Sequence, residues 1–433
     1  MLRLALVLVP LLALAGCQKE NAGFCPANPG KEGCPPDGAT GGPCKSNAEC
    51  TDKPGTTVCD LMDNDGTCVP CTATDHAACG VMTPICPNHT CVACANDSDC
   101  GTDGLCLPTG ACAASDNIIH VSATGVLAGS CGAKAKGQQP CSLANALGAV
   151  DSVRNVIKID DSGTYTNSGA GNFNVTANVT IVAGNAMLLK NVDGQPILSI
   201  SDNTSATIVG GIIAGAHTPN GDGIRCGTNS TLGIFGTIIQ SNDTFGIDAG
   251  GCSLVTLSRA QILMNKRGGI KGVTGKFVIV GNVFANNGDA QNPNKTVEIA
   301  TGSDPMNRLE FNTIANNTAL NGVNAGLDCT VGTSFTARNN IIWGNTGVIQ
   351  ISGICMHSYS DIGPFATPVP GTTPGTGNKN NDPLLTSTWH LGTGSPAIGS
   401  ADPMADLTGL AAKDIEGDMR VSRADMGADQ VAK

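Results

Sequence analysis

The loop His217-Thr-Pro-Asn-Gly-Asp-Gly-Ile-Arg225 holds three side chains that could do acid/base chemistry. An imidazole at His217, a carboxylate at Asp222 and a guanidinium at Arg225 are residue types that catalytic sites use to move protons and hold charge. The adjacent Asp160 and Asp161 form a second candidate. A Gly-Asp-Gly sequence between strands is far more often a turn. The sequence therefore favours a structural role for these residues over catalysis.

The start of the chain predicts export. Arg3 precedes an apolar run that is too short to span a bilayer, and the run closes on Leu14-Ala-Gly-Cys17. This ending resembles the lipobox of bacterial lipoproteins, in which the Cys becomes the diacylated N-terminal residue. The resemblance implies that residues 1–16 are removed and that Cys17 carries the lipid (palmitate) that holds the protein on a membrane.

The residue after Cys17 bears on which membrane this is. Gln18 stands where an inner-membrane retention signal would have Asp, so the outer membrane is favoured. We expect a surface-exposed protein, although the sequence leaves open whether it faces the periplasm or the exterior.

Cysteine usage fits an oxidising compartment. The chain has 21 cysteines, and setting Cys17 aside leaves an even 20, which reads as a disulfide framework. Residues 17–43 are rich in Gly and Pro and are expected to form a flexible stalk. In the cysteine-rich module 44–115 the cysteines fall into three similar groups of four: Cys44, Cys50, Cys59, Cys68; Cys71, Cys79, Cys86, Cys91; and Cys94, Cys100, Cys106, Cys112.

Two spacings within this module suggest metal binding. Cys68/Cys71 and Cys91/Cys94 have the Cys-x-x-Cys spacing of zinc sites, but both pairs straddle junctions between the groups, so disulfides are favoured. Asp63-Asn-Asp-Gly66 hints at a calcium loop, yet Leu61 occupies the first ligand position and no Glu follows. We therefore expect a turn there, and no resident metal or cofactor.

Charge and composition exclude one class of partner. The formal net charge is −11, and charged residues make up only 14% of the chain. The tightest basic cluster, Lys266, Arg267, Lys271 and Lys276, is small and interrupted, whereas nucleic-acid binding needs a basic face. We therefore expect no nucleic-acid partner.

Beyond residue 117, short β-branched runs recur at a period typical of a parallel β-solenoid. Aligning the runs on Ile212, Ile238, Ile262, Val283, Thr313 and Ile341 gives steps of 26, 24, 21, 30 and 28 residues. An antiparallel sandwich would show turns every 8–12 residues. Asn286-Asn287, Asn316-Asn317 and Asn345 end successive runs, where Asn tolerates left-handed turns and its amide can hydrogen-bond along a stacked column.

Cysteine spacing supports the solenoid. Cys226 and Cys252 are 26 residues apart, as are Cys329 and Cys355, so one coil would place each Cys over its partner, within reach of a disulfide. Cys131 and Cys141 are expected to close a loop before a short helix at 142–150. The expected layout is a β-helix at 117–363, a linker at 364–381 and a C-terminal cap segment at 382–433.

From His120 onward the chain resembles right-handed parallel β-helix proteins of the pectin-lyase-like superfamily and, more narrowly, choice-of-anchor Q surface proteins. The matching segments are His120-Val-Ser-Ala-Thr-Gly125, Cys141-Ser-Leu-Ala-Asn-Ala-Leu147, Gly163-Thr-Tyr165, Asn381-Asp-Pro-Leu384, Trp389-His-Leu391, Gly394-Ser-Pro-Ala-Ile398, Asp414-Ile-Glu-Gly-Asp-Met-Arg420 and Asp425-Met-Gly-Ala428. Gly399 and Asp429-Gln430 depart from the family pattern. Anchors vary within this family, and here Cys17 would serve as one.

The resemblance leaves three functions to weigh. The first is a non-catalytic surface protein with an adhesive or structural role, which contacts a surface protein or an extracellular polysaccharide. The second is a polysaccharide lyase or glycoside hydrolase, for which calcium would be the expected cofactor of a lyase. The third is a glycan-binding module without turnover. The hydrolases' Gly-His-Gly and Arg-Ile-Lys segments are absent, His120, His357 and His390 fit structural positions, and aromatic residues are few, so the first is favoured.

Overall fold

We describe the fold from a computed structural model. It describes residues 44–431 except 52–56, 62–65, 76–78, 102, 127–130, 132–139, 167–171, 190–193, 218–219, 292–293, 301–303, 321–324, 330–334, 348–349, 354 and 365–374. The predicted signal, Cys17, the stalk and most of the predicted linker lie outside the described residues. The chain divides into two compact units, Met1–Cys94 and Ala95–Lys433.

The described part of the first unit is held together by disulfides. Strands β1 (Val58–Asp60) and β2 (Thr67–Val69) pair antiparallel, and the 3₁₀ helices are η1 (Asn47–Cys50) and η2 (Pro87–His89). In each of the first two cysteine groups, the first Cys bonds the third and the second bonds the fourth: Cys44–Cys59, Cys50–Cys68, Cys71–Cys86 and Cys79–Cys91. Neither Cys-x-x-Cys pair forms an internal disulfide. Cys68 bonds Cys50, Cys71 bonds Cys86 and Cys91 bonds Cys79.

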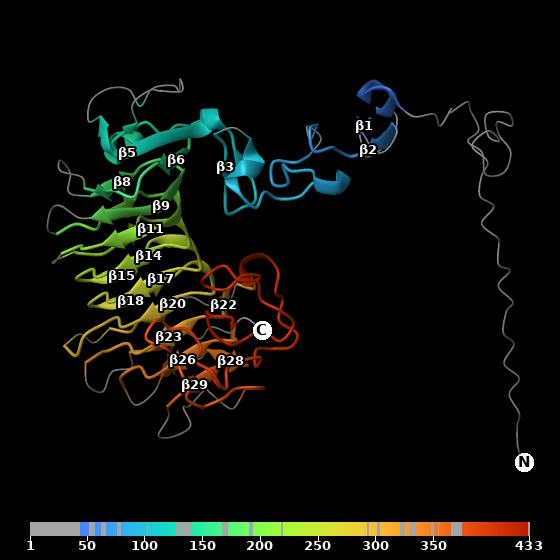
Figure 1. Cartoon of the computed structure of the whole chain (residues 1–433). Coiled ribbons are helices and arrows are strands. Elements are labelled where there is room, and N and C mark those ends of the chain that lie inside the picture. The colour runs from blue at the N-terminus through green and yellow to red at the C-terminus, as the bar shows by residue number, and fades with distance from the viewer. Residues whose placement is uncertain are drawn as a thin grey trace, which may run out of the picture. The chain divides into compact units, whose positions relative to one another are not determined.

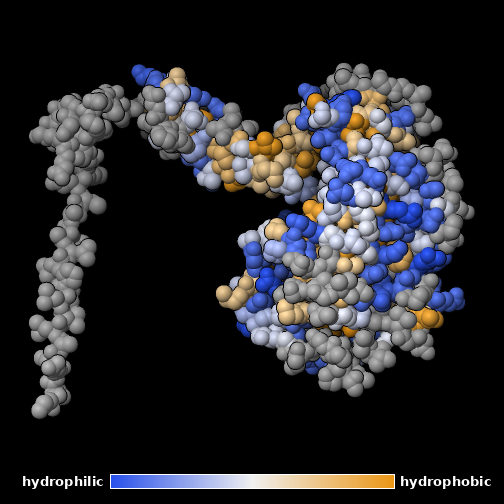
Figure 2. Space-filling model, turned by 180° about the vertical axis from the view of Figure 1, so that it is seen from behind, coloured by the Kyte–Doolittle hydropathy of each residue, from blue (hydrophilic) through white to orange (hydrophobic). Residues whose placement is uncertain are grey.

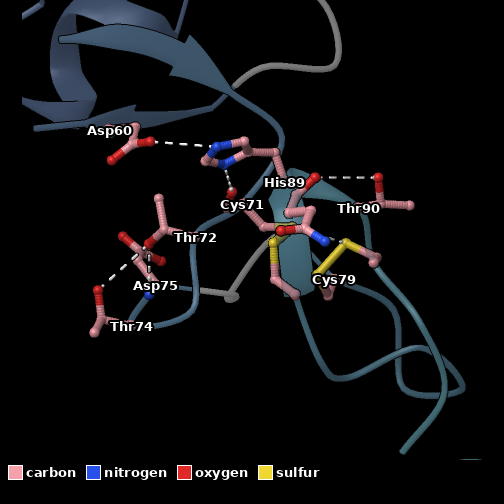
Figure 3. The surroundings of a disulfide bond; sticks show 11 residues. Asp60, Cys71, Thr72, Thr74, Asp75, Cys79, His89 and Thr90 are labelled. Carbon is pink, nitrogen blue, oxygen red and sulfur yellow. Dashed lines mark hydrogen bonds and ion pairs between the residues drawn. A yellow bond between two sulfur atoms is a disulfide. The ribbon is translucent and has the colours of Figure 1, made fainter. Parts of the chain in front are cut away.

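A histidine joins the two cysteine groups. The His89 ring lies between Asp60, at the end of β1, and the carbonyl oxygen of Cys71 (Figure 3). Its Nε2 is 3.3 Å from Asp60 Oδ2, and its Nδ1 is 3.2 Å from the Cys71 oxygen. Asp60 is buried. The Asn47 amide also donates to Asp75 across the two groups, at 2.6 Å. A module with almost no aliphatic core is thus stabilised by crosslinks and by polar contacts between its halves.

Three cysteines of the third group, Cys100, Cys106 and Cys112, lie in the second unit, whereas Cys94 is the last residue of the first. Strands β3 (Leu105–Cys106) and β4 (Cys112–Ala113) form a hairpin between the 3₁₀ helices η3 (Asp97–Cys100) and η4 (Ser115–Asn117), and Cys100 bonds Cys112. Leu105 and Ala113 pack with Ile118 and Val156 of the solenoid. This apolar contact fixes the hairpin on the first coils.

The second unit is a right-handed parallel β-solenoid, in agreement with the expected fold class (Figure 1). One column of strands contains β5 (Ile118–Val126), β6 (Val156–Ile159), β9 (Val179–Leu189), β11 (Ser205–Ala214), β13 (Ser230–Phe235), β16 (Cys252–Ser258), β19 (Lys276–Val280), β22 (Arg308–Glu310), β25 (Thr336–Arg338) and β28 (Met356–Ser358). The long strands β9 and β11 bend into the second column, which continues through β7 (Thr164–Tyr165), β14 (Ile238–Gln240), β17 (Gln261–Leu263), β20 (Val283–Ala285), β23 (Thr313–Ala315), β26 (Ile341–Trp343) and β29 (Asp361–Gly363).

The third column is an 8-stranded sheet. Its strands are β8 (Phe173–Val175), β10 (Leu198–Ile200), β12 (Ile224–Cys226), β15 (Phe245–Asp248), β18 (Gly268–Val273), β21 (Val297–Ile299), β24 (Leu327–Cys329) and β27 (Ile351–Gly353). Parallel pairing stacks one aliphatic residue per coil into the dry interior: Leu198, Ile224, Ile247, Ile270, Val297, Leu327 and Ile351. The recurring β-branched runs are therefore the coil interior.

The observed register corrects one position of the sequence alignment. Ile212, Ile238, Val283, Thr313 and Ile341 do share a rung position, but the residue aligned with them in β17 is Gln261. Ile262 instead pairs with Ile239 and faces the interior. Because side chains alternate along a strand, a shift of one residue moves a side chain to the other face.

The expected cysteine pairs are present as disulfides, but not between equivalent rung positions. Cys226 bonds Cys252 and Cys329 bonds Cys355, with Cα–Cα distances of 5.4 and 5.8 Å. In the strand pairing, Arg225 lies beside Asp248 and Cys329 lies beside Gly353, so these coils are shorter than 26 residues. Cys252 and Cys355 therefore lie a few residues beyond the positions that pair directly with Cys226 and Cys329. Cys131 bonds Cys141.

Two ladders of buried asparagines run along the solenoid. In one, Asn242, Asn265, Asn287, Asn317 and Asn345 occupy the same turn in successive coils and end on Gln350. In the other, the side-chain bonds run along Asn282, Asn312 and Asn340, whose backbone N–H donates to Ser360. The amides of Asn265, Asn282, Asn287, Asn312, Asn317 and Asn345 each donate both to the next side-chain oxygen and to a backbone carbonyl, as Asn287 does to Asn317 and Ile262. The preceding Asn286 and Asn316 are left-handed (φ 55° and 53°), in line with the expected turns.

The two ends of the solenoid are treated differently. Helix α2 (Leu143–Gly148) begins at Ser142, whose hydroxyl accepts from Asn145 N–H, and it buries Leu143, Ala146 and Leu147 in the interior at the first coils. The segment expected as a C-terminal cap, which includes η5 (Gly409–Ala411), lies along the side of the last coils instead (Figure 1). Its apolar residues pack on Val280, Phe311 and Ile341, whose side chains face outward and need cover.

His357 lies in the interior of the last coil. It follows Ala337 in the ladder, it is 5% exposed, and neither ring nitrogen has a hydrogen-bond partner. Burial lowers the pKa of His357 to about 4. The ring is therefore neutral in the folded protein at neutral pH, which agrees with the structural role expected from the sequence.

Replacing Asn265 by Ala should lower the free energy of unfolding by roughly 2–5 kcal/mol, because it removes the acceptor of the buried Asn242 amide and backbone N–H, and one donor each from the Asn287 oxygen and the Ile239 carbonyl. Chemical denaturation measures this change. Thr176→Ala, at an exposed position directly after β8, is the control and should change stability by no more than about 0.5 kcal/mol. Equal effects of the two substitutions would contradict a stabilising ladder.

His357 should also make stability depend on pH. Its folded pKa of about 4 lies below the unfolded value of 6.5. As pH falls from 6.5 towards 4, only the unfolded chain gains this proton, and the free energy of unfolding falls by up to about 3 kcal/mol. His357→Leu should remove this loss. The difference between wild type and variant, measured by denaturation at each pH, isolates it from Asp361 and Glu416. Burial raises their pKa values to about 6 and about 7, which gives the opposite slope.

Candidate functional site

The loop singled out by the sequence is built into the solenoid wall. Asp222 is 2% exposed, and its carboxylate accepts from Arg225 Nε at 3.1 Å, from Arg225 Nη2, from the Thr244 hydroxyl and from Phe245 N–H. These bonds tie the turn to the next coil. Asp222 and Arg225 are thus brought together, in a contact that holds two coils in register.

His217 lies apart from that contact. Its side chain is 61% exposed, and Nδ1 is 3.3 Å from Asp243, which also pairs with Lys266 at 2.5 Å. The carboxylate that it contacts is therefore a different one from the buried Asp222, which Arg225 holds. The three candidates therefore do not converge on one reacting position.

The second acidic candidate is also committed to structure. Asp161 accepts from the Tyr165 hydroxyl at 2.6 Å and from the backbone N–H of Ala123 and Gly163. These bonds, the Tyr165 bond first, lower the pKa of Asp161, which suits an acceptor and not a general acid. Asp160 pairs with His120 at 2.8 Å.

A cleft of about 490 Å³ lies on the outer side of β22 and β25. Leu309 points into the interior, so Arg308 and Glu310 on either side of it point outward into the cleft. The cleft is lined by Asp304, Pro305, Asn307, Arg308, Glu310, Phe335 and Arg338. The sequence contains a signal for this cleft, because the 28-residue step that aligns Thr313 with Ile341 also aligns Glu310 with Arg338.

Glu310 fixes two guanidinium groups in this cleft. It is 4% exposed, and its two oxygens accept from Arg308 Nη2 at 2.7 Å and from Arg338 Nε at 2.9 Å. Arg338 also lies 3.7 Å from Asp402 of the C-terminal segment. Each guanidinium has more N–H groups than these contacts use. Two oriented guanidinium groups are suited to binding the oxygens of a polar ligand.

The neighbouring groups leave the cleft nearly balanced in charge. Asp304 pairs with Lys276 at 2.9 Å. Asn307 accepts from Phe277 N–H through its side-chain oxygen, while its amide nitrogen is buried and has no hydrogen-bond partner. The cleft therefore offers several donors without a strong net charge, a combination that suits hydroxyl-rich or singly charged ligands.

The third column presents a polar outer face. Arg225, Asp248 and Lys271 occupy successive rungs, with Lys271 Nζ 3.8 Å from Asp248. Further along, Asp328 pairs with Lys295 at 2.9 Å. Figure 2 shows a largely hydrophilic surface on the solenoid in that view, with scattered hydrophobic residues. Such a face can contact a polar polymer through hydrogen bonds.

Four groups of side chains in the described residues are close enough to hold a metal ion. Three of them consist of cysteines, and all of these are disulfide-bonded and so lack thiolates. The fourth is His390, Glu416 and Asp429 of the C-terminal segment. Among the described residues, no helix is both long and apolar enough to cross a membrane.

Comparisons with known proteins identify no family for this chain. No family model matches the chain, and no curated protein matches it. Among solved structures, the chain is similar to the crystal structure of pectate lyase Pel9A, with 13% sequence identity over 73% of this chain and 96% of that chain and a TM-score of 0.40. A likeness this low carries no argument about function, so the fold assignment stands on the strand pairing described above.

Proposed function

We propose that this protein is an exported lipoprotein, anchored to the bacterial outer membrane through Cys17, with a non-catalytic adhesive or structural role. In this proposal the disulfide-bonded module acts as a spacer, and the solenoid contacts an extracellular polysaccharide or a surface protein. The resemblance to choice-of-anchor Q surface proteins is part of the same proposal. The observation that carries the proposed binding role is the cleft in which Glu310 orients Arg308 and Arg338.

The hydrogen bonds that Asp222 and Glu310 accept favour ligand binding over catalytic turnover. A general acid or base needs a carboxyl group that can gain or lose a proton next to the substrate. Asp222 accepts four hydrogen bonds within the wall, and Glu310 is held by two guanidinium groups. Neither is arranged to exchange protons with a ligand, whereas the remaining N–H groups of the two arginines are placed to donate to one.

The disulfides support export. Eighteen described cysteines in the two units are disulfide-bonded, and such bonds persist outside reducing compartments. Disulfide crosslinks also suit an N-terminal module that must keep its shape without a large core. The hydrogen-bonded ladders help to keep the shape of the solenoid.

The alternative is a polysaccharide lyase or glycoside hydrolase. The juxtaposition of guanidinium and carboxylate groups in one cleft favours it, because such enzymes place basic and acidic groups around a sugar unit. Under this alternative, calcium would be the expected cofactor of a lyase.

A panel of uronate polymers and neutral glycans, with and without calcium, separates these functions. We expect binding without turnover, and we expect Arg308→Gln to weaken binding about tenfold because it removes charge-assisted hydrogen bonds. Lys158→Gln, on β6 away from the cleft, is the matched control. Turnover that Asp222→Ala or Arg225→Ala abolishes would establish the enzyme instead. Wild-type protein that binds no glycan would restrict the role to protein contacts or structure.

Lipid attachment is tested separately in the producing cell. Cys17→Ala should abolish incorporation of labelled palmitate and move the protein from the membrane fraction to the soluble exported fraction, because the acyl chains supply the membrane affinity. Cys131→Ala, which removes a disulfide cysteine and no lipid site, is the control. Labelling that survives Cys17→Ala would disprove the anchor.

A further inference from the structure

Three side chains of the C-terminal segment meet outside the cleft: His390, Glu416 and Asp429. His390 Nδ1 is 3.2 Å from Asp429 Oδ1, and His390 Nε2 is 3.4 Å from Glu416 Oε1. The two ring nitrogens thus face two different carboxylates. Asp429 is buried, whereas the side chains of His390 and Glu416 are 39% and 40% exposed.

A rigid frame positions all three side chains. Their chain neighbours Trp389, Ile415 and Ala428 belong to one apolar cluster that packs on Val283 and Ala285 of β20 and on Ala315 of β23. Backbone hydrogen bonds complete the frame: Ile415 N–H donates to the Ala428 carbonyl at 3.0 Å, and Leu391 N–H donates to Asp429 Oδ2 at 2.8 Å. The site is therefore organised by the fold before any ligand binds.

The hydrogen bond to Asp429 sets the state of the ring. A neutral imidazole that donates from Nδ1 to Asp429 carries its lone pair on Nε2, directed at Glu416. Nε2 and Glu416 Oε1 then form a pair of acceptors that needs a cation between them. Their 3.4 Å separation is longer than a good N–H···O hydrogen bond. It matches the edge of about 3.4 Å between two ligands of a tetrahedral zinc ion with bonds of about 2.0–2.2 Å.

The surroundings favour a cation at this position. Asp414 and Asp425 are fully buried nearby, and the guanidinium of Arg420 donates to the carbonyls of Gly427 and Ala428 instead of to a carboxylate. With Asp429 and Glu416, these carboxylates give the surroundings of the ring a negative charge that a bound cation would offset.

We propose that His390 Nε2 and the Glu416 carboxylate bind a divalent transition-metal ion of the zinc class. Asp429 acts from behind the imidazole, in the arrangement by which carboxylates orient metal-bound histidines. Imidazole with carboxylate suits zinc and its neighbours, whereas calcium takes six to eight oxygen ligands. Because both ligands are partly exposed, the other coordination positions face solvent. The inference does not depend on the proposed function.

The test is equilibrium binding of ZnCl2 and of CaCl2 to the full-length exported chain, purified without a polyhistidine tag, with thermal unfolding as a second readout. We expect one zinc per chain, a higher Tm with zinc, and no such effect with calcium. Glu416→Gln should remove zinc binding without lowering the metal-free Tm, since the side chain is partly exposed and the substitution removes a charge that burial disfavours. His390→Ala should also remove binding, and Asp429→Asn should weaken it about 10–100-fold.

His217→Ala is the matched control, because His217 also pairs with one aspartate but belongs to none of the described side-chain groups that could hold a metal ion. It should retain full zinc binding. The proposal is overturned if folded wild type binds no zinc, in which case a proton alone occupies the gap, or if Glu416→Gln and His390→Ala bind zinc as wild type does.

Discussion

The constraint on which this structure depends is that every coil buries a polar turn. A solenoid coil must bend, and the bend leaves backbone N–H and C=O groups inside the wall where water cannot satisfy them. The asparagine ladders satisfy these groups in successive coils: inside a ladder, as at Asn265, Asn287 and Asn312, the side-chain oxygen accepts a backbone N–H and an amide N–H from the coil before, and the amide also donates to a carbonyl. Coil registers are therefore tied to one another along the rod.

Because of this arrangement, outward-facing positions of the strands are not needed to fill the interior or to complete the turns. The interior is filled by aliphatic stacks and the turns by amides, so outward positions of the strands can carry any polar residue. Where charges occur on that face, they occur as pairs between adjacent coils, as with Asp248 and Lys271 or Glu310 and Arg338. A pair fixed at both ends by a rigid wall holds its remaining donors in a constant direction, which is what a binding surface requires.

The C-terminal segment combines these features. It covers outward apolar residues of the last coils, it contributes Asp402 beside the Arg338 cleft, and it holds the His390 cluster on a frame made with β20 and β23. It has little regular secondary structure, and its conformation is set by buried aspartates that accept several backbone N–H groups. Asp414 accepts from Glu416, Gly417 and Asp418 in this way.

The sequence by itself determined the parallel solenoid, the helix near 142–150, the left-handed asparagine turns and three cysteine pairs, Cys131–Cys141, Cys226–Cys252 and Cys329–Cys355. These follow from local patterns, because apolar period, turn residues and spacing report on what one coil must bury. It did not determine the connectivity of the N-terminal cysteines, the register at Ile262 or the lateral course of the tail, because these depend on contacts between segments that lie apart in the sequence. The same holds for function, since only the fold shows that Asp222 is used within the wall and that Glu310 lies beside Arg338.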